Sequence, residues 1–198
     1  MAATASTMLE LGTRCPAFDL PDYGAGKDGS TRVTRDDFES APATVVMFIC
    51  NHCPFVHHVQ EGIVELARAF PRVGFLAISS NDVETHPDDA PEMMAREASR
   101  LGYPFPYLYD ETQGVAKAFR AACTPDFFVF DGELRLVYRG QFDDSRPAKG
   151  SSSAASAKGE DLRAAIGAAL RGERSPDQKP SLGCNIKWKP GNAPDYFG

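Results

Sequence analysis

Two cysteines, Cys50 and Cys53, stand at the junction between two strongly patterned segments of the chain. The run before them, ATVVMFI at 43–49, is continuously apolar and partly β-branched, which is typical of a strand buried on both faces of a sheet. After them, apolar residues recur every three or four positions through 54–70, which predicts an amphipathic helix. The two thiols are therefore expected at the carboxyl end of a strand, where α/β sheets carry their sites.

That position favours redox chemistry at the two cysteines. A helix N-terminus presents unpaired N–H groups and a partial positive charge, and both stabilise a thiolate. The Cys-x-x-Cys spacing lets two sulfurs approach bonding distance, and Pro54 suits a first helical turn. The plainer alternative is that both are ordinary core cysteines.

The remaining pattern predicts an α/β fold with a central mixed sheet flanked by helices. Thr85 and Asp88 offer capping chemistry for one of these helices. The other expected elements are a strand at 73–79, helices at 88–101 and 112–121, strands at 126–130 and 134–139 around an Asp131-Gly132 turn, a polar loop at 147–159 and a helix from Leu162 to Leu170. We predict one domain over 1–171, with a turn-rich N-terminal extension, followed by an irregular tail over 172–198 that packs on it.

Composition and charge exclude several classes of partner. The chain has 198 residues and a formal net charge of −6, and no dense block of Lys or Arg, so nucleic acid is not an expected partner. No apolar run reaches the roughly 18 residues that span a bilayer, and no secretory signal is apparent. Five cysteines are too few for a disulfide-stapled secreted domain. A cytoplasmic location is expected, with an organellar transit segment left open.

Three stretches carry a resemblance to a known family. LGTRCPAFDLPD, FICNHCPFV and CTPDFFVFDGELRLVYRGQFDD resemble the thioredoxin superfamily, and within it the peroxiredoxin-like (redoxin, AhpC/TSA-related) branch. The tail SLGCNIKWKPGNAPDYF is similar to that of an uncharacterised peroxiredoxin-like subgroup. The resemblance implies a thioredoxin-like fold in which a cis proline, Pro125 after Thr124, faces the cysteines. It also implies that the backbone beside this proline pairs with a substrate chain as an added strand.

The same resemblance implies a thiol–disulfide oxidoreductase, with no cofactor besides the cysteine pair. Cys50 is expected to be the more exposed, attacking cysteine, and Cys53 the resolving one. Asn51 and His52 lie between them, and a histidine in the second intervening place makes such a couple more oxidising. The expected partners are a protein or small-molecule disulfide or a peroxide, and a thiol reductant. The oligomeric state is not predicted.

A thiol peroxidase is the first alternative, with Cys53 peroxidatic and Cys50 or Cys184 resolving. Here Cys50 occupies the place of the family's Thr or Ser, and Thr124-Pro125 fill the place of its arginine, so charge stabilisation of the O–O bond would need a substitute. Arg120 and Arg139 are the candidates for that substitute.

Other readings use the remaining cysteines and histidines. A copper or zinc site could use Cys50, Cys53 and His57. Cys184 is equally well explained as a packing residue that anchors the tail near Trp188. The last reading is a binding module with a vestigial motif. The residues assigned to structure or to solvated helix surface are Cys15, Cys123, His57 and His58.

Overall fold

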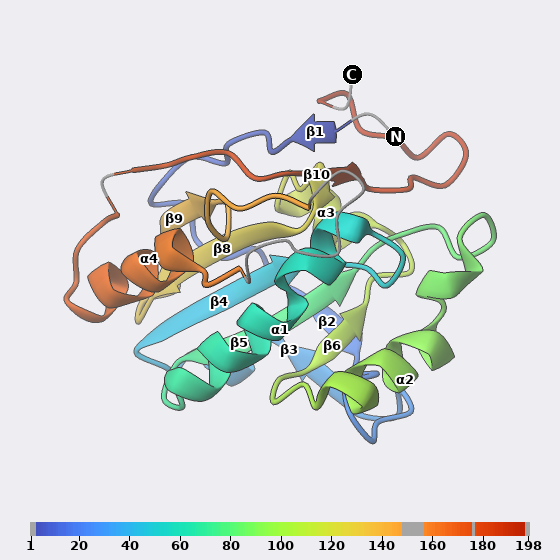
Figure 1. Cartoon of the computed structure of the whole chain (residues 1–198), viewed down its shortest axis with the longest axis horizontal. Coiled ribbons are helices and arrows are strands. Elements are labelled where there is room, and N and C mark those ends of the chain that lie inside the picture. The colour runs from blue at the N-terminus through green and yellow to red at the C-terminus, as the bar shows by residue number, and fades with distance from the viewer. Residues whose placement is uncertain (1–2, 148–156, 176, 197–198) are drawn as a thin grey trace.

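The computed structural model describes residues 3–147, 157–175 and 177–196, and it is built around a mixed five-stranded sheet (Figure 1). The strand order is β6-β5-β4-β8-β9. The strands are β4 (Ala43–Phe48), β5 (Gly74–Ser79), β6 (Tyr107–Tyr109), β8 (Asp126–Asp131) and β9 (Leu136–Gly140). β4, β5 and β6 are parallel, whereas β8 and β9 run antiparallel to their neighbours. The expected central mixed sheet is confirmed.

Helices and an N-terminal segment cover the two faces of this sheet. Along β4, Val45 and Met47 join one core cluster and Val46 and Phe48 join the other, as the alternation of side chains in a strand requires. The first cluster includes residues of α1 (Pro54–Ala69), α2 (Pro91–Leu101) and α4 (Glu160–Leu170). The second includes residues of α3 (Gly114–Ala118), β2 (Asp19–Pro21) and β3 (Arg32–Thr34). Because β4 is buried on both faces, its continuous apolar run is explained.

Two predicted helices differ from the observed ones. The helix expected at 88–101 begins only at Pro91, after a 3-10 turn η2 (Pro87–Asp89), and its N-cap is Ala90 without a side-chain hydrogen bond. The capping roles predicted for Thr85 and Asp88 are therefore wrong, and Pro91 occupies the first turn instead. The helix expected at 112–121 shrinks to α3, because Gln113 and Arg120 take positive φ angles of 62° and 53° at its two ends.

The predicted irregular tail contains a strand, which is a correction. β10 (Leu182–Asn185) lies between β1 (Ala3–Ala5) and β7 (Cys123–Thr124) in a separate three-stranded antiparallel sheet. Figure 1 shows β1 and β10 next to each other along the upper side of the molecule. Most of the loop predicted at 147–159 lies outside the described residues. The tail thus contributes backbone pairing to the fold.

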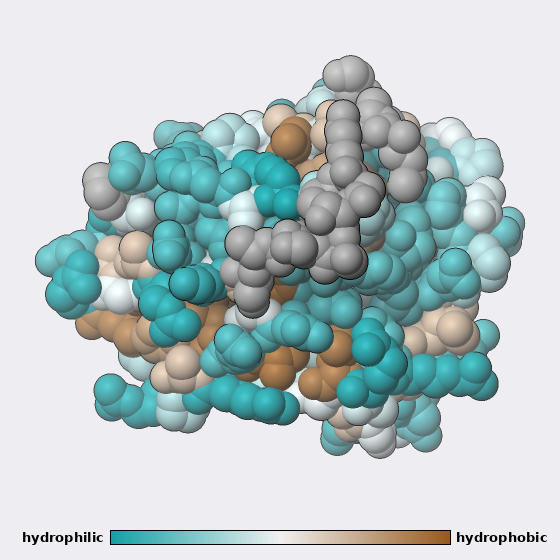
Figure 2. Space-filling view, viewed as in Figure 1, coloured by the Kyte–Doolittle hydropathy of each residue, from teal (hydrophilic) through white to brown (hydrophobic). Residues whose placement is uncertain are grey.

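The surface facing the viewer in Figure 2 is mainly hydrophilic, and apolar side chains show mostly in the gaps between the helices. Among the helices that the structure describes, none combines the length and the apolar character needed to cross a bilayer.

Candidate functional site

Both cysteines of the motif are buried. β4 ends at Phe48 and α1 begins at Pro54, so that Cys53 is the N-cap of α1 as the pattern predicts. Cys50 is 1% exposed and Cys53 is 0% exposed. Exposure therefore does not single out Cys50 as the attacking cysteine, because side chains and backbone from three other segments pack around both sulfurs.

Thr124 and Pro125 form the first of these segments. The Thr124-Pro125 peptide bond is cis, as the resemblance implied. The Thr124 hydroxyl lies 3.3 Å from Cys50 Sγ, and the Cys53 thiol donates a hydrogen bond to the Thr124 carbonyl oxygen at 3.2 Å. The predicted residues on the two distant stretches of sequence are therefore in direct contact.

The tail supplies the second segment. β10 pairs antiparallel with β7, with Cys184 opposite Thr124 and Asn185 opposite Cys123. Cys184 is buried. Burial, followed by interaction with the nearby Cys53 sulfur, raises the pKa of Cys184 to about 12. Three thiols therefore meet at the N-terminus of α1, with Cys53 between the other two.

This arrangement favours Cys53 as the thiolate. Interaction with the Cys50 thiol lowers the pKa of Cys53 to about 5, and interaction with Cys184 acts in the same direction against burial. The pKa of Cys50 is raised, because it donates to Cys53, is buried and faces the Asp89 carboxylate. The Thr124 carbonyl favours the neutral Cys53 thiol, but the interactions with Cys50 and Cys184 outweigh it. A thiolate is the nucleophilic form of cysteine.

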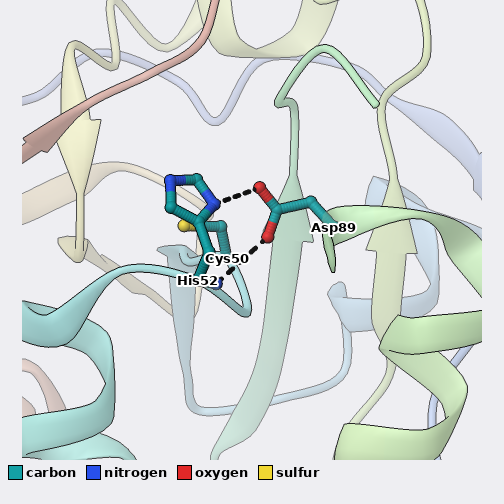
Figure 3. Close-up of side chains that lie close together, drawn as sticks. All are labelled: Cys50, His52 and Asp89. Atoms are coloured by element: carbon teal, nitrogen blue, oxygen red, sulfur yellow. Dashed lines mark hydrogen bonds and ion pairs between the residues drawn. The ribbon is translucent and has the colours of Figure 1, made fainter. Parts of the chain in front are cut away.

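Asp89 belongs to the third segment, and sequence reasoning did not identify it. Its carboxylate is 0% exposed and accepts hydrogen bonds from His52 Nδ1 at 2.6 Å and from the His52 N–H at 3.3 Å (Figure 3). It also accepts from the Asn51 N–H at 2.7 Å and from Asn81 Nδ2 at 2.8 Å. These bonds outweigh burial and lower the pKa of Asp89. In turn the Asp89 hydrogen bond raises the pKa of His52. Asn51 and His52 are thus held by one buried carboxylate.

A histidine outside the motif packs against this group. The rings of His52 and His86 stack with centroids 4.8 Å apart. Burial, followed by the charge of His52, lowers the pKa of His86. His52 is therefore part of a charged network rather than an isolated group beside the sulfurs.

The proposed metal ligands do not come together as expected. His57 is exposed and its Nε2 contacts the Asn51 carbonyl oxygen. In the described part of the chain, the three candidate donors that cluster are Cys50, His52 and Asp89, with ligand atoms within 4.8 Å of one another. The His52 Nδ1 of this group is already hydrogen-bonded to Asp89.

The remaining candidates lie around this centre or away from it. Cys123 is buried, and its pKa is raised by burial and by Asp126. Burial raises the pKa of Cys15 to about 12 in the other core cluster. His58 Nε2 lies 2.8 Å from the Ser145 hydroxyl.

Neither candidate for the missing arginine hydrogen-bonds a sulfur in the described structure. The Arg120 guanidinium lies 4.8 Å from the centroid of the Tyr196 ring. Arg139 is buried on β9 and donates to the Leu9 carbonyl oxygen at 3.1 Å. Both side chains therefore serve contacts with the terminal segments.

Comparisons with known proteins agree with this architecture. A family model described as the AhpC/TSA family matches residues 11–139. An uncharacterised conserved protein from Geobacillus kaustophilus is 54% identical, with a TM-score of 0.87, covering 96% of this chain and 98% of that one. A hypothetical protein from Sinorhizobium meliloti 1021 is 45% identical, with a TM-score of 0.86, covering 95% of this chain and 100% of that one. None of the curated proteins matches the chain.

More distant structures show the same fold. The peroxidoxin BcpB from Mycobacterium tuberculosis superposes with a TM-score of 0.58 at 19% identity, covering 85% of this chain and all of that chain. The thioredoxin domain of a thiol-disulfide oxidoreductase from Bacteroides vulgatus gives a TM-score of 0.55 at 15% identity, covering 67% of this chain and 89% of that one. The thioredoxin-like fold predicted from the sequence is therefore confirmed.

Proposed function

Because the chain belongs to the AhpC/TSA family, we propose that it is a thiol–disulfide oxidoreductase working through the Cys50–Cys53 dithiol. Family and fold support redox activity in general. The observation that supports the finer proposal is that both buried sulfurs lie at the N-terminus of α1 against the Thr124 hydroxyl and carbonyl, and that their interaction lowers the pKa of Cys53 and raises that of Cys50. Such a pair holds one proton where two separate thiols would hold two, and is poised to react at neutral pH.

The roles of the two cysteines are reversed relative to the expectation from sequence. The Cys53 thiolate attacks one sulfur of a disulfide RSSR, forms a mixed Cys53–SR disulfide and releases RS⁻. Cys50 then loses its proton and attacks the Cys53 sulfur, which releases the second RS⁻. The products are the Cys50–Cys53 disulfide and, after protonation, two RSH. A separate thiol reductant returns the protein to the dithiol.

Single-turnover mixing tests this order. Reduced protein is mixed with cystamine, a small disulfide, and the adducts are identified by mass. Cys50→Ser should accumulate the mixed disulfide on Cys53, because the group that resolves it is gone. Cys53→Ser should react far more slowly. A stable adduct on Cys50 in Cys53→Ser, formed at the wild-type rate, would restore Cys50 as the attacking residue.

A second candidate is thiol peroxidase activity, favoured by the contact between Cys53 and Cys184. The Cys53 thiolate would attack a hydroperoxide ROOH, giving Cys53–SOH and, with one proton, ROH. The Cys50 or Cys184 thiol would then form a disulfide with Cys53 and release water. Peroxide oxidation that survives Cys50→Ser and yields a Cys53–Cys184 disulfide by peptide mapping would favour this cycle over disulfide exchange.

A further inference from the structure

The backbone beside the cis proline is already paired within the chain. Thr124 lies opposite Cys184, and the Ile186 N–H donates to the Ala122 carbonyl oxygen at 3.0 Å, so β10 follows β7 through its whole length. A residue in a strand directs its N–H and C=O to the same neighbouring strand. Since β10 takes this edge of β7, a second extended chain has no place there. The strand addition implied by the resemblance is therefore blocked in this structure.

The pairing depends on a close approach that only glycine permits. A Cβ atom built on Gly183 would lie 2.0 Å from the Thr124 carbonyl oxygen and 3.1 Å from the Pro125 nitrogen. Both neighbours are backbone atoms, so no side-chain rotation relieves the clash. A second close approach involves the part of the tail before β10: a Cβ atom built on Gly140, in β9, would lie 2.3 Å from the Lys179 carbonyl oxygen. Two glycines thus seat the tail against β7 and β9.

Other contacts anchor the tail on both sides of β10. Before it, the Ser181 hydroxyl donates to the Gly140 carbonyl oxygen at 2.5 Å. After it, the Lys187 N–H donates to Asn81 Oδ1 at 2.8 Å, and the Asn81 amide donates to Asp89. Ile186 is buried in the core. The tail is therefore an integral layer over the redox centre, joined through Asn81 to the carboxylate that holds Asn51 and His52.

We infer that β10 permanently occupies the edge of β7 at which a substrate strand would otherwise pair. We further infer that the Cys50–Cys53 centre exchanges with low-molecular-weight disulfides rather than with extended polypeptide disulfides. This inference rests on the proposed function. It follows from the occupied edge and from the burial of both sulfurs. A small disulfide needs room at one sulfur only, whereas a polypeptide also needs backbone pairing beside Pro125.

The test compares two oxidants in single turnover. Pre-reduced protein is mixed with cystamine or with insulin, and oxidation is followed by the loss of thiolate absorbance at 240 nm. Wild-type protein should react with insulin slower than with cystamine by about 100-fold, the effect of a poorly placed reacting group. Gly183→Ala should raise the insulin rate about tenfold while leaving the cystamine rate nearly unchanged. Gly167→Ala, in α4, is the matched control, because its Cβ meets only the end of Arg171 at 3.4 Å.

Gly140→Ala provides a second displacement of the tail if Gly183→Ala does not fold. It should change the ratio of the two rates in the same direction. Equal rates for insulin and cystamine in wild-type protein would overturn the inference and leave the proposed function intact. An unchanged ratio in both folded variants would overturn it as well. A dithiol that reacts with neither oxidant would overturn the proposed function and the inference together.

Discussion

Replacing Cys50 with alanine should raise the pKa of Cys53, because Cys50 is the first of the donors that hold Cys53 as a thiolate. A hydrogen bond to a charged group contributes about 1.5–3 kcal/mol. One pKa unit corresponds to about 1.36 kcal/mol, so the loss of this donor converts to about one to two units. Starting from about 5, the pKa of Cys53 in Cys50→Ala should therefore lie near 6 to 7.

The absorbance of the reduced protein at 240 nm, titrated from acid to neutral pH, measures this shift directly. The other four thiols are silent in that range, since the pKa values of Cys15 and Cys184 are raised to about 12 and those of Cys50 and Cys123 are also raised. The transition should therefore vanish in Cys53→Ser. That loss assigns the signal to one sulfur.

Cys50→Ser is the matched control, because a hydroxyl keeps a donor at the same position. Its Cys53 pKa should lie closer to the wild-type value than that of Cys50→Ala. An unchanged midpoint in Cys50→Ala would refute the reasoning, since Cys53 would then owe its low pKa to the helix N-terminus or to Cys184 alone. A transition that persists in Cys53→Ser would refute it as well.

Further predictions concern the groups around Cys53. Asp89→Asn should lower the pKa of His52 in an NMR titration and reduce the free energy of unfolding in urea by about 2–3 kcal/mol. Asp89 raises the pKa of His52, so the ionic part of this stabilisation is fully present at pH values below the pKa of histidine in the unfolded chain. It is lost as the pH rises through the raised pKa of His52 in the folded protein. The difference in free energy of unfolding between wild type and Asp89→Asn should therefore be larger at pH 6 than at pH 9. Cys184→Ala should raise the pKa of Cys53, measured by titrating the absorbance at 240 nm. The Cys50–Cys53 disulfide should still form in this variant, as detected by peptide mapping. Equilibration with glutathione should give a potential above the roughly −270 mV of thioredoxin, because a stabilised Cys53 thiolate favours the reduced form; a value at or below it would contradict this.

The parts of the fold that sequence could predict are those with a local pattern. The apolar run of β4, the helical periodicity of α1 and the cysteines between them are contiguous, so their order alone places two sulfurs at a helix N-terminus. The resemblance added Thr124 and Pro125, and the structure brings them to the sulfurs. The protonation of the pair was not accessible in this way, because it depends on which thiol donates and on what faces each sulfur.

Asp89 illustrates why such information is not local. It lies 37 residues beyond His52, in a 3-10 turn that ends just before Ala90, the N-cap of α2. In the sequence it has the pattern of an ordinary acidic residue near a helix start, where the capping pattern favours Asp88 instead. Only the return of the chain after β5 brings its carboxylate to Asn51 and His52.

The strand in the tail, β10, could not be predicted from the sequence either, because its pairing also depends on contacts between distant parts of the chain. β10 has no alternating pattern long enough to predict a strand, and β7, its partner, is two residues long. Their pairing is possible because Gly183 has no side chain, since a Cβ atom there would clash with the Thr124 carbonyl oxygen. The absence of a side chain leaves no hydrophobic signal to read. Yet this glycine lets Cys184 approach Cys53 and lets β10 occupy the edge beside Pro125, so the selectivity that we propose for small disulfides depends on a residue that touches no substrate.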